Sequence, residues 1–253
     1  MTIYFYNFIL GCSKCNKGFP RIALPNGKQK GNFSGFDRTQ WTARDPLTHR
    51  EHALRSTRAN SAAEKRRAEA SGVRWTELLC LDYFDPIQHH NIDTMHCFWL
   101  GIAKHMTKHF FQSGILSKQN LQSIQEKMNT VRVPSTVGRI PYKIASGFSA
   151  FTADQWKNWT LIYSSVVLKG TLPREDYQVW MMFVKAAVFF SKKIVTVEEV
   201  NLADRLMVQF CQAVERRYGE AFCTPNMHMA CHVAELIRKF GGIHGHWCFS
   251  FER

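Results

Sequence analysis

The 253-residue sequence contains no apolar run near the roughly 20 residues that a membrane-spanning helix needs. The short apolar stretch 3–10 has neither a basic leader nor a small-residue cleavage site, so we expect no signal peptide. Internal repeats and low-complexity segments are absent as well. These absences argue against a membrane protein, a secreted protein and a repeat protein, and favour residence in the cytosol or the nucleus.

Cysteine is too sparse for a disulfide scaffold, with eight cysteines in the whole chain. Eleven histidines accompany them, which favours metal binding in a reducing compartment. The sequence has one CxxC motif, Cys12 and Cys15, and no second one. It also lacks a phosphate-binding glycine loop and a GxSxG motif, so nothing points to a P-loop enzyme or a serine hydrolase.

Acidic residues are scarce relative to basic ones, with 20 Asp and Glu against 33 Lys and Arg and a net charge of +13. Such a balance favours an acidic partner, of which nucleic acid is the commonest large example. A basic soluble protein without that role is the alternative. The candidate phosphate-contacting residues lie in two basic segments and are Arg50, Arg55, Arg58, Lys65, Arg66, Arg67, Arg139 and Lys143.

Apolar residues recur mainly at three- and four-residue spacing, which predicts a mainly α fold with little sheet. Hydrophobic residues make up 45% of the chain, enough to fill a core. We expect one strand in residues 1–10 and an irregular loop over 16–47. The predicted helices cover 48–71, a segment beginning at Thr94, 117–130, segments beginning at Thr152 and Pro173, and 197–218. Trp156 and Trp159 are expected in the core rather than on a base-stacking surface.

The CxxC pair can supply two ligands of a tetrahedral zinc, which needs two more. His228 and His232 are four residues apart in a helix that Thr224-Pro225 is predicted to start and Gly241-Gly242 to end, so both imidazoles would share one face. Together the four residues would form a Cys₂His₂ site. The alternative is two ordinary cysteines and a helix with two histidines, and the similar pair His105 and His109 shows how readily such spacing arises.

Asp93 and His96 lie three residues apart at a predicted helix start. The interpretation we prefer is that Asp93 caps the helix beside a partly buried histidine, and a catalytic or metal-binding role is the alternative. Asp82 and Asp85 are interpreted as turn residues.

Several motifs together resemble transposases of the CACTA/EnSpm superfamily, over about residues 11–253. They recur in the same order as in that family and are Gly35-Phe36-Asp37-Arg38, Tyr83-Phe84-Asp85-Pro86, Ile92-Asp93-Thr94-Met95-His96, Leu100-Gly101-Ile102-Ala103-Lys104-His105, Gly138-Arg139-Ile140-Pro141-Tyr142-Lys143-Ile144, residues 147–157, Thr224-Pro225-Asn226-Met227-His228 and Phe249-Ser250-Phe251-Glu252.

The resemblance implies an RNase H-like nuclease fold interrupted by a large helical insertion. It implies three acidic residues that hold two divalent metals for DNA cleavage, with Glu252 as the last of them. It also implies one structural zinc held by Cys12, Cys15, His228 and His232, transposon-end DNA as partner, a nuclear location and association with full-length transposase.

Applied to this chain, the resemblance predicts four segments: 1–47 with the zinc-binding CxxC, a basic helix and linker over 48–93, a helical insertion bundle over 94–223, and 224–253 with the histidine helix and the last acid. The family's other two acids precede the CxxC, but only eleven residues precede Cys12. We therefore expect an inactive transposase fragment with an incomplete sheet, and Mg²⁺ or Mn²⁺ only where the missing acids are supplied. A non-catalytic, zinc-stabilised DNA- or protein-binding module and a remnant without selected function are the alternatives.

Overall fold

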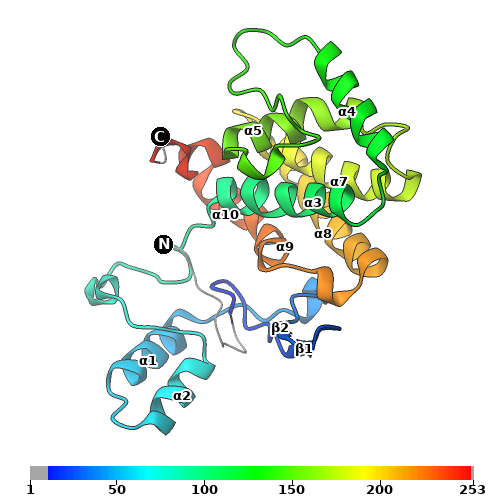
Figure 1. Cartoon of the computed structure of the whole chain (residues 1–253). Helices are drawn as coiled ribbons and strands as arrows, with labels where there is room; N and C mark the ends of the chain where they lie inside the picture. The colour runs from blue at the N-terminus through cyan, green and yellow to red at the C-terminus, as the bar shows by residue number, and fades with distance from the viewer. Residues whose placement is uncertain (1–10, 252–253) are drawn as a thin grey trace. The chain divides into compact units, whose positions relative to one another are not determined.

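The computed structural model describes the backbone of residues 11–251 and all their side chains except those of residues 67–69 and 250. These residues form two compact units, the first made of 11–91 with Tyr218–Pro225 and the second of Ile92–Arg217 with 226–251. Helices dominate, and a single two-stranded sheet is present in the described part of the chain, so the mainly α prediction is confirmed (Figure 1). The strand expected in residues 1–10 lies outside the described residues.

A short antiparallel hairpin occupies the segment of the first unit that was expected to be irregular. Strand β1 (Arg21–Ala23) pairs with β2 (Gln29–Gly31). The backbone N–H of Gly27 donates to the Leu24 carbonyl at 2.9 Å, and the Gly27 φ of +76° suits a residue without a side chain. Strands of three residues are too short to show an alternating pattern in the sequence, which is why the hairpin was not predicted.

The basic segment forms two helices rather than the one that was predicted. Helix α1 (Pro46–Thr57) begins after Asp45, whose carboxylate accepts from the Thr48 backbone N–H, and α2 (Ala62–Ala70) follows after a break. The break arises because Ser61 and Glu64 cap each other: the Ser61 hydroxyl accepts from the Glu64 N–H at 3.2 Å, and the Glu64 carboxylate accepts from the Ser61 N–H at 3.1 Å. A new helix therefore starts at this point.

Arg50 of α1 fastens the loop that follows the two helices. Its guanidinium donates to the carbonyls of Leu79 and Phe84, both at 2.5 Å. The same loop buries Leu79 in a small core with Ala53 and Val73. Short 3₁₀ turns complete this part of the unit and are η1 (Arg38–Gln40) and η2 (Glu77–Cys80).

The short segment Tyr218–Pro225 joins the first unit beside the hairpin. It contains η6 (Glu220–Phe222). Lys30 of the hairpin donates to the carbonyls of Ala221 at 2.6 Å and Cys223 at 3.0 Å. These bonds attach a late part of the sequence to an early one.

The second unit is a helical bundle whose helices begin largely where the sequence predicts. Ser117 and Thr152 each cap a helix in a reciprocal capping box, and Gly241 ends another at φ +81°. The elements are η3 (Met95–Ala103), α3 (Lys104–Gln112), α4 (Lys118–Thr130), η4 (Phe148–Ala150), α5 (Ala153–Asn158), η5 (Trp159–Tyr163), α6 (Ser164–Val167), α7 (Arg174–Phe190), α8 (Val197–Tyr218), α9 (Pro225–Ala230), α10 (Val233–Phe240), η7 (Ile243–Gly245) and η8 (Cys248–Ser250).

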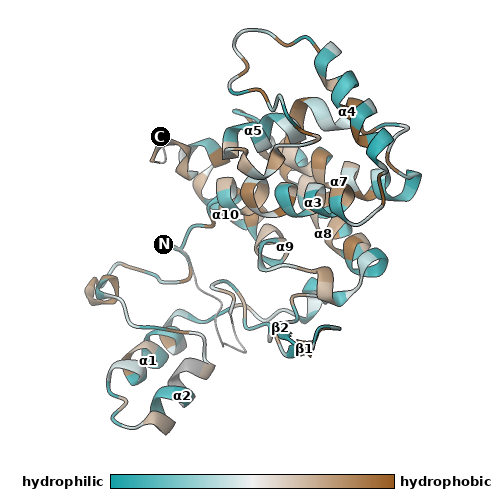
Figure 2. Ribbon diagram, in the orientation of Figure 1, coloured by the Kyte–Doolittle hydropathy of each residue, from teal (hydrophilic) through white to brown (hydrophobic). Residues whose placement is uncertain are grey.

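Aromatic side chains fill the core of this bundle, and Figure 2 shows stretches of hydrophobic residues along its helices. Phe183 of α7 packs on Phe98 of η3 and Phe210 of α8, with ring centroids 6.1 and 5.3 Å apart. Trp156 and Trp159 are fully buried, which confirms their predicted core position. Truncating a ring such as Phe183 to alanine would cost about 3–5 kcal/mol. No helix within residues 11–251 is long and apolar enough to cross a lipid bilayer.

The helix expected from Thr94 is wound as a π-helix, η3, over most of its first half. Its predicted buried face is present, because Met95, Phe98 and Ile102 are at most 1% exposed. Gly101 in this helix lies against α9, where an added Cβ would stand 2.4 Å from the Asn226 side-chain nitrogen. The wide winding and the missing side chain together allow α9 to approach closely.

Candidate metal centre

Cys12 and Cys15 lie in a tight, buried turn of the first unit, each at most 2% exposed. The backbone N–H of Lys14 donates to Cys12 Sγ at 3.3 Å. Such a bond to sulfur supports the thiolate form that metals bind. The CxxC segment is therefore a buried turn in which both cysteines are candidate metal ligands.

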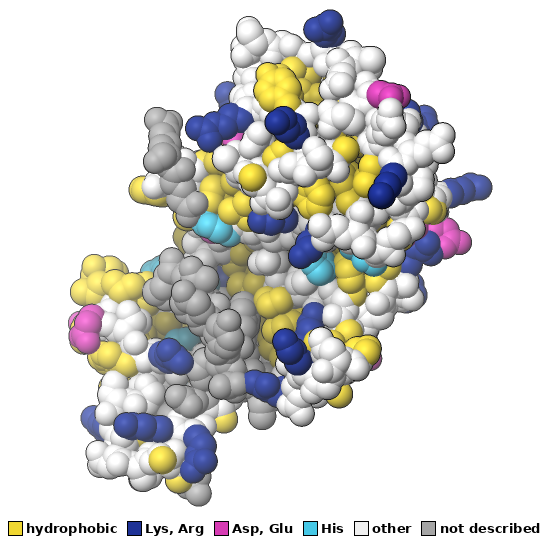
Figure 3. All heavy atoms as spheres, in the orientation of Figure 1, with side chains coloured by type: hydrophobic (Ala, Val, Ile, Leu, Met, Phe, Trp, Pro, Cys, Tyr) yellow, Lys and Arg dark blue, Asp and Glu magenta, His cyan; other side chains and the backbone are white. Residues whose placement is uncertain are grey.

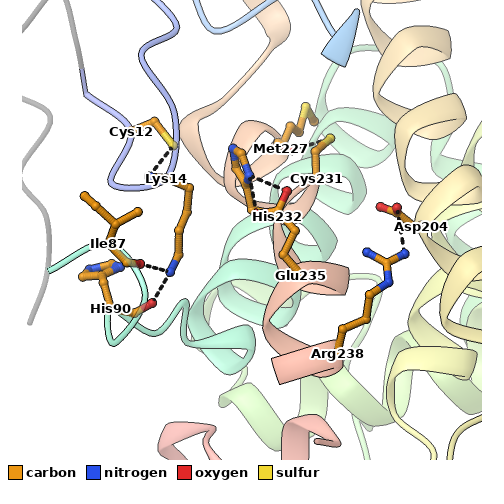
Figure 4. A network of polar contacts seen from close by, with 10 residues as sticks. All are labelled: Cys12, Lys14, Ile87, His90, Asp204, Met227, Cys231, His232, Glu235 and Arg238. Atoms are coloured by element: carbon orange, nitrogen blue, oxygen red, sulfur yellow. Dashed lines mark hydrogen bonds and ion pairs between the residues drawn. The ribbon is translucent and has the colours of Figure 1, made fainter. Parts of the chain in front are cut away.

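Two buried cations hold this turn in place. The Lys14 ammonium donates to the carbonyls of Ile87 at 2.5 Å and His90 at 2.6 Å (Figure 4). Arg44 donates through Nε to the Cys12 carbonyl at 2.6 Å. Burial lowers the pKa of Arg44, while the nearby thiols of Cys12 and Cys15 act in the opposite direction. Arg44 also donates through Nη2 to the Ser71 carbonyl at 3.1 Å, so it ties the CxxC turn to the chain near Ser71.

His228 and His232 lie side by side in the second unit, with ring centroids 5.2 Å apart. Both are buried, at 1% and 4% exposure. The single helix predicted here is wrong, because a turn at Cys231 and His232 separates α9 from α10. The helix begins at Pro225, as Thr224-Pro225 predicted, but the Thr224 hydroxyl makes no capping hydrogen bond within the described residues. The turn keeps i to i+3 bonds, so the two rings still share one side of the chain.

Glu235 orients one of these imidazoles. Its carboxylate lies 3.2 Å from Nδ1 of His232, as Figure 4 shows. A carboxylate only accepts, so this contact places the proton on Nδ1 and leaves the Nε2 lone pair for a metal. Carboxylate–histidine pairs of this kind are the usual second layer of a zinc site.

The ligand atoms of Cys12, Cys15, His228 and His232 all lie within 4.8 Å of one another, and all four residues are buried. Two thiolates and two imidazoles are the donors of structural zinc sites, where ligands surround the metal tetrahedrally at about 2.0–2.3 Å. The cluster could therefore hold a metal ion such as zinc. The predicted cofactor is supported to this extent, whereas the identity of the metal stays a prediction.

The remaining candidate ligands and acids have different surroundings. Glu252, the predicted last acid, lies outside the described residues. His105 and His109 belong to no group of metal-binding side chains found in residues 11–251. Asp85 is a turn residue as expected, because its carboxylate accepts from the N–H groups of Ile87 and Gln88.

Most of the predicted phosphate-contacting residues are exposed, and Figure 3 shows Lys and Arg side chains over the surface that α1 and α2 form. Arg50 differs, because backbone carbonyls occupy its guanidinium. Arg55 lies 3.4 Å from Glu51 in an exposed pair. The side chain of Arg67 is outside the described part. The others are exposed and are Arg58, Lys65, Arg66, Arg139 and Lys143.

Three residues that support the centre were not predicted. Glu235 follows His232 by three residues, a spacing that could have marked it as a partner of the imidazole. Lys14 and Arg44 bond to carbonyls that only the folded chain brings near them. No pattern in the sequence identifies these two.

Fold and site together define a mainly helical protein with a candidate Cys₂His₂ metal centre. No protein-family model, no curated protein and no solved structure matches the chain. The resemblance to CACTA/EnSpm transposases consequently stays a prediction from the sequence motifs.

Proposed function

We propose that this chain is a zinc-stabilised, nucleic-acid-binding domain of the CACTA/EnSpm transposase lineage. The observation that carries the proposal is the buried Cys12, Cys15, His228 and His232 cluster, which consists of the four residues that the resemblance implies as zinc ligands. Cysteine and histidine pairs with metal-ligand spacing often arise by chance in a sequence. Four such residues that are all buried, with ligand atoms within 4.8 Å of one another, arise by chance much less often.

The metal in this proposal is structural. Four protein ligands leave no coordination position for water or substrate. The ligands are far apart in the sequence, so the bound ion restrains a long stretch of chain and contributes directly to folding stability. Arg44 and the Lys14 N–H hold the CxxC turn through bonds to the Cys12 carbonyl and sulfur, and Glu235 orients His232.

Nucleic acid is the proposed partner because the chain carries a net charge of +13 and its basic residues on α1 and α2 are mostly exposed. Each phosphate contact releases counterions, so the affinity should fall steeply as salt rises. Proposed contacts are Arg58 and Lys65, with Arg139 and Lys143 in the second unit. Transposon ends and a nuclear location belong to the same proposal.

Metal analysis of the purified chain tests the carrying observation. After dialysis against a weak chelator, about one zinc per chain should remain, and Cys12→Ser/Cys15→Ser should remove it. Cys80→Ser changes an exposed cysteine outside the cluster and is the matched control. Retention of zinc by the double variant would refute the assignment.

DNA binding needs its own test. The affinity for duplex DNA, measured between 50 and 200 mM salt, should fall at least about tenfold. Arg58→Glu/Lys65→Glu should weaken binding further and reduce the salt slope, whereas Lys185→Glu, on an exposed position of α7, is the control. A flat salt dependence would exclude contacts to phosphates and leave the protein-binding alternative.

A further inference from the structure

A second group of metal-binding side chains lies entirely within the second unit. Asp93 precedes η3, His96 lies in its first turn, and Cys248 begins η8. One ligand atom from each lies within 4.8 Å of the others. An oxygen, a nitrogen and a sulfur donor are thus close together.

The backbone holds this group together independently of any metal. The Asp93 carboxylate accepts from the N–H groups of Met95 at 3.2 Å and His96 at 3.1 Å, which confirms its predicted role at the start of the helix. It also accepts from the Cys248 N–H at 2.9 Å, far along the chain. A helix cap needs only the first two bonds, so the third shows that Asp93 also positions the segment that carries the thiol.

Charge at the group is suited to a cation. Burial by itself would raise the pKa of Asp93, but hydrogen bonds from the His96 side chain and from backbone N–H groups outweigh it and lower the pKa below its usual range. His96 contacts this carboxylate directly through Nδ1.

The group is open to solvent. The His96 side chain is 49% exposed and the Asp93 side chain 18%, and Cys248 is half-buried. An ion could reach the group without unfolding of the chain. Three protein ligands also leave a tetrahedral ion one position for water or an anion.

We propose that Asp93, His96 and Cys248 form a second, exchangeable transition-metal site. The mixed donor set favours zinc or another borderline divalent ion over Mg²⁺ and Ca²⁺, which prefer oxygen alone. The bound ion fastens η8 to the start of η3 and offers its remaining position to water or a small anionic ligand.

Cobalt titration of the metal-free full chain tests this site, because thiolate-bound Co²⁺ absorbs in the near ultraviolet. The wild-type chain should bind about two equivalents, one tight and one weak, and His96→Ala should lose the weak one. Cys12→Ser/Cys15→Ser should lose the tight one and keep the weak one, so failure of the proposed zinc centre is distinguishable from failure of this site. A single equivalent in the wild type, or an unchanged weak equivalent in His96→Ala, would overturn the proposal.

Thiol protection gives a second readout that does not depend on variants folding. Zinc at micromolar concentration should slow alkylation of Cys248 by iodoacetamide at least about tenfold, measured by mass spectrometry of the modified peptide, because the metal-bound sulfur is blocked. Cys80, exposed and outside the group, is the internal control whose alkylation should not change. Equal alkylation of Cys248 with and without zinc would contradict metal binding at this group.

Discussion

The two groups of metal-binding side chains satisfy the same distance limit but differ in their surroundings. Cys12, Cys15, His228 and His232 are all buried, and buried cations and a carboxylate support them. Asp93, His96 and Cys248 are partly exposed and number three rather than four. Closeness of donor atoms is common to both, so burial and ligand number are what separate a permanent structural ion from an exchangeable one.

The largest predicted effect comes from removing the two cysteine sulfurs of the buried group, called the closed site here, which consists of Cys12, Cys15, His228 and His232. Cys12→Ser/Cys15→Ser should destabilise the zinc-loaded chain by several kcal/mol, because the metal's binding energy is part of the folding energy. Thermal unfolding followed by circular dichroism measures the loss. The partly exposed group of Asp93, His96 and Cys248 is called the open site. The corresponding change there, Cys248→Ser, should shift the midpoint of thermal unfolding by only a few degrees. Equal shifts in both variants would show that the two sites do not differ in their contribution to stability.

Gly101→Ala should affect both groups at once. The new Cβ would stand 2.4 Å from the Asn226 side chain and 2.9 Å from the His96 carbonyl. Relief of these clashes requires η3 or α9 to move, at a cost of about 1–3 kcal/mol. Because η3 carries His96 and α9 carries His228, cobalt affinity should fall at both sites.

Gly170→Ala is the control for Gly101→Ala. No atom lies within 4 Å of a Cβ added at Gly170, so the only strain in this variant comes from the backbone φ of +73°. It should lower stability without changing metal affinity. A Gly101→Ala protein that keeps both affinities would show that the approach of α9 to η3 does not set the geometry of the ligands.

Glu235→Gln should weaken the closed site alone. The amide can still reach Nδ1 of His232, but it removes the negative charge that raises the basicity of the imidazole. Zinc affinity should fall about 10- to 100-fold in competition with a coloured chelator, with little change in the stability of the metal-free chain. Glu198→Gln, on an exposed position of α8, is the control.

Local signals in the sequence predicted much of the second unit. Ser117, Thr152 and Gly241 mark helix ends through bonds to their immediate neighbours, so their positions were predictable. The break at Ser61 has a local signal too, the Ser–x–x–Glu capping box, which lies within a long charged run. The π-helix was not predictable, because it lies where Gly101 packs against Asn226 across the fold, a contact that no local pattern marks.

The sequence predicted each of the two ligand pairs of the closed site separately. The spacing of Cys12 with Cys15 and of His228 with His232 is local, and the two rings are close even though a turn interrupts their helix. Spacing suggested joining the two pairs but left the alternative of unrelated residues open, and the family resemblance favoured the joined site. The open site illustrates the opposite limit, because Asp93 and His96 were recognised as a pair while Cys248 reaches them only through tertiary structure.

The smallest predicted effect is a pH dependence in the unit that carries the CxxC turn. Burial, with the positive charges of Arg44 and His52, lowers the pKa of His49 from 6.5 to about 4. The unfolded chain therefore takes up a proton below pH 6.5, whereas the folded chain does so only near pH 4. Stability from this residue should be complete above pH 6.5, decline as the pH falls from 6.5 to about 4, and level off below that.

His49→Gln should remove this part of the pH dependence. Unfolding of the metal-free chain, followed in urea at pH 7 and pH 5, should show a smaller loss of stability in the variant than in the wild type. The metal-free form is used because acid also protonates the ligands of both sites, which would add a second source of instability. His89→Gln, at an exposed histidine of the same unit, is the control. An identical loss of stability in His49→Gln and the wild type would place the acid sensitivity in other residues.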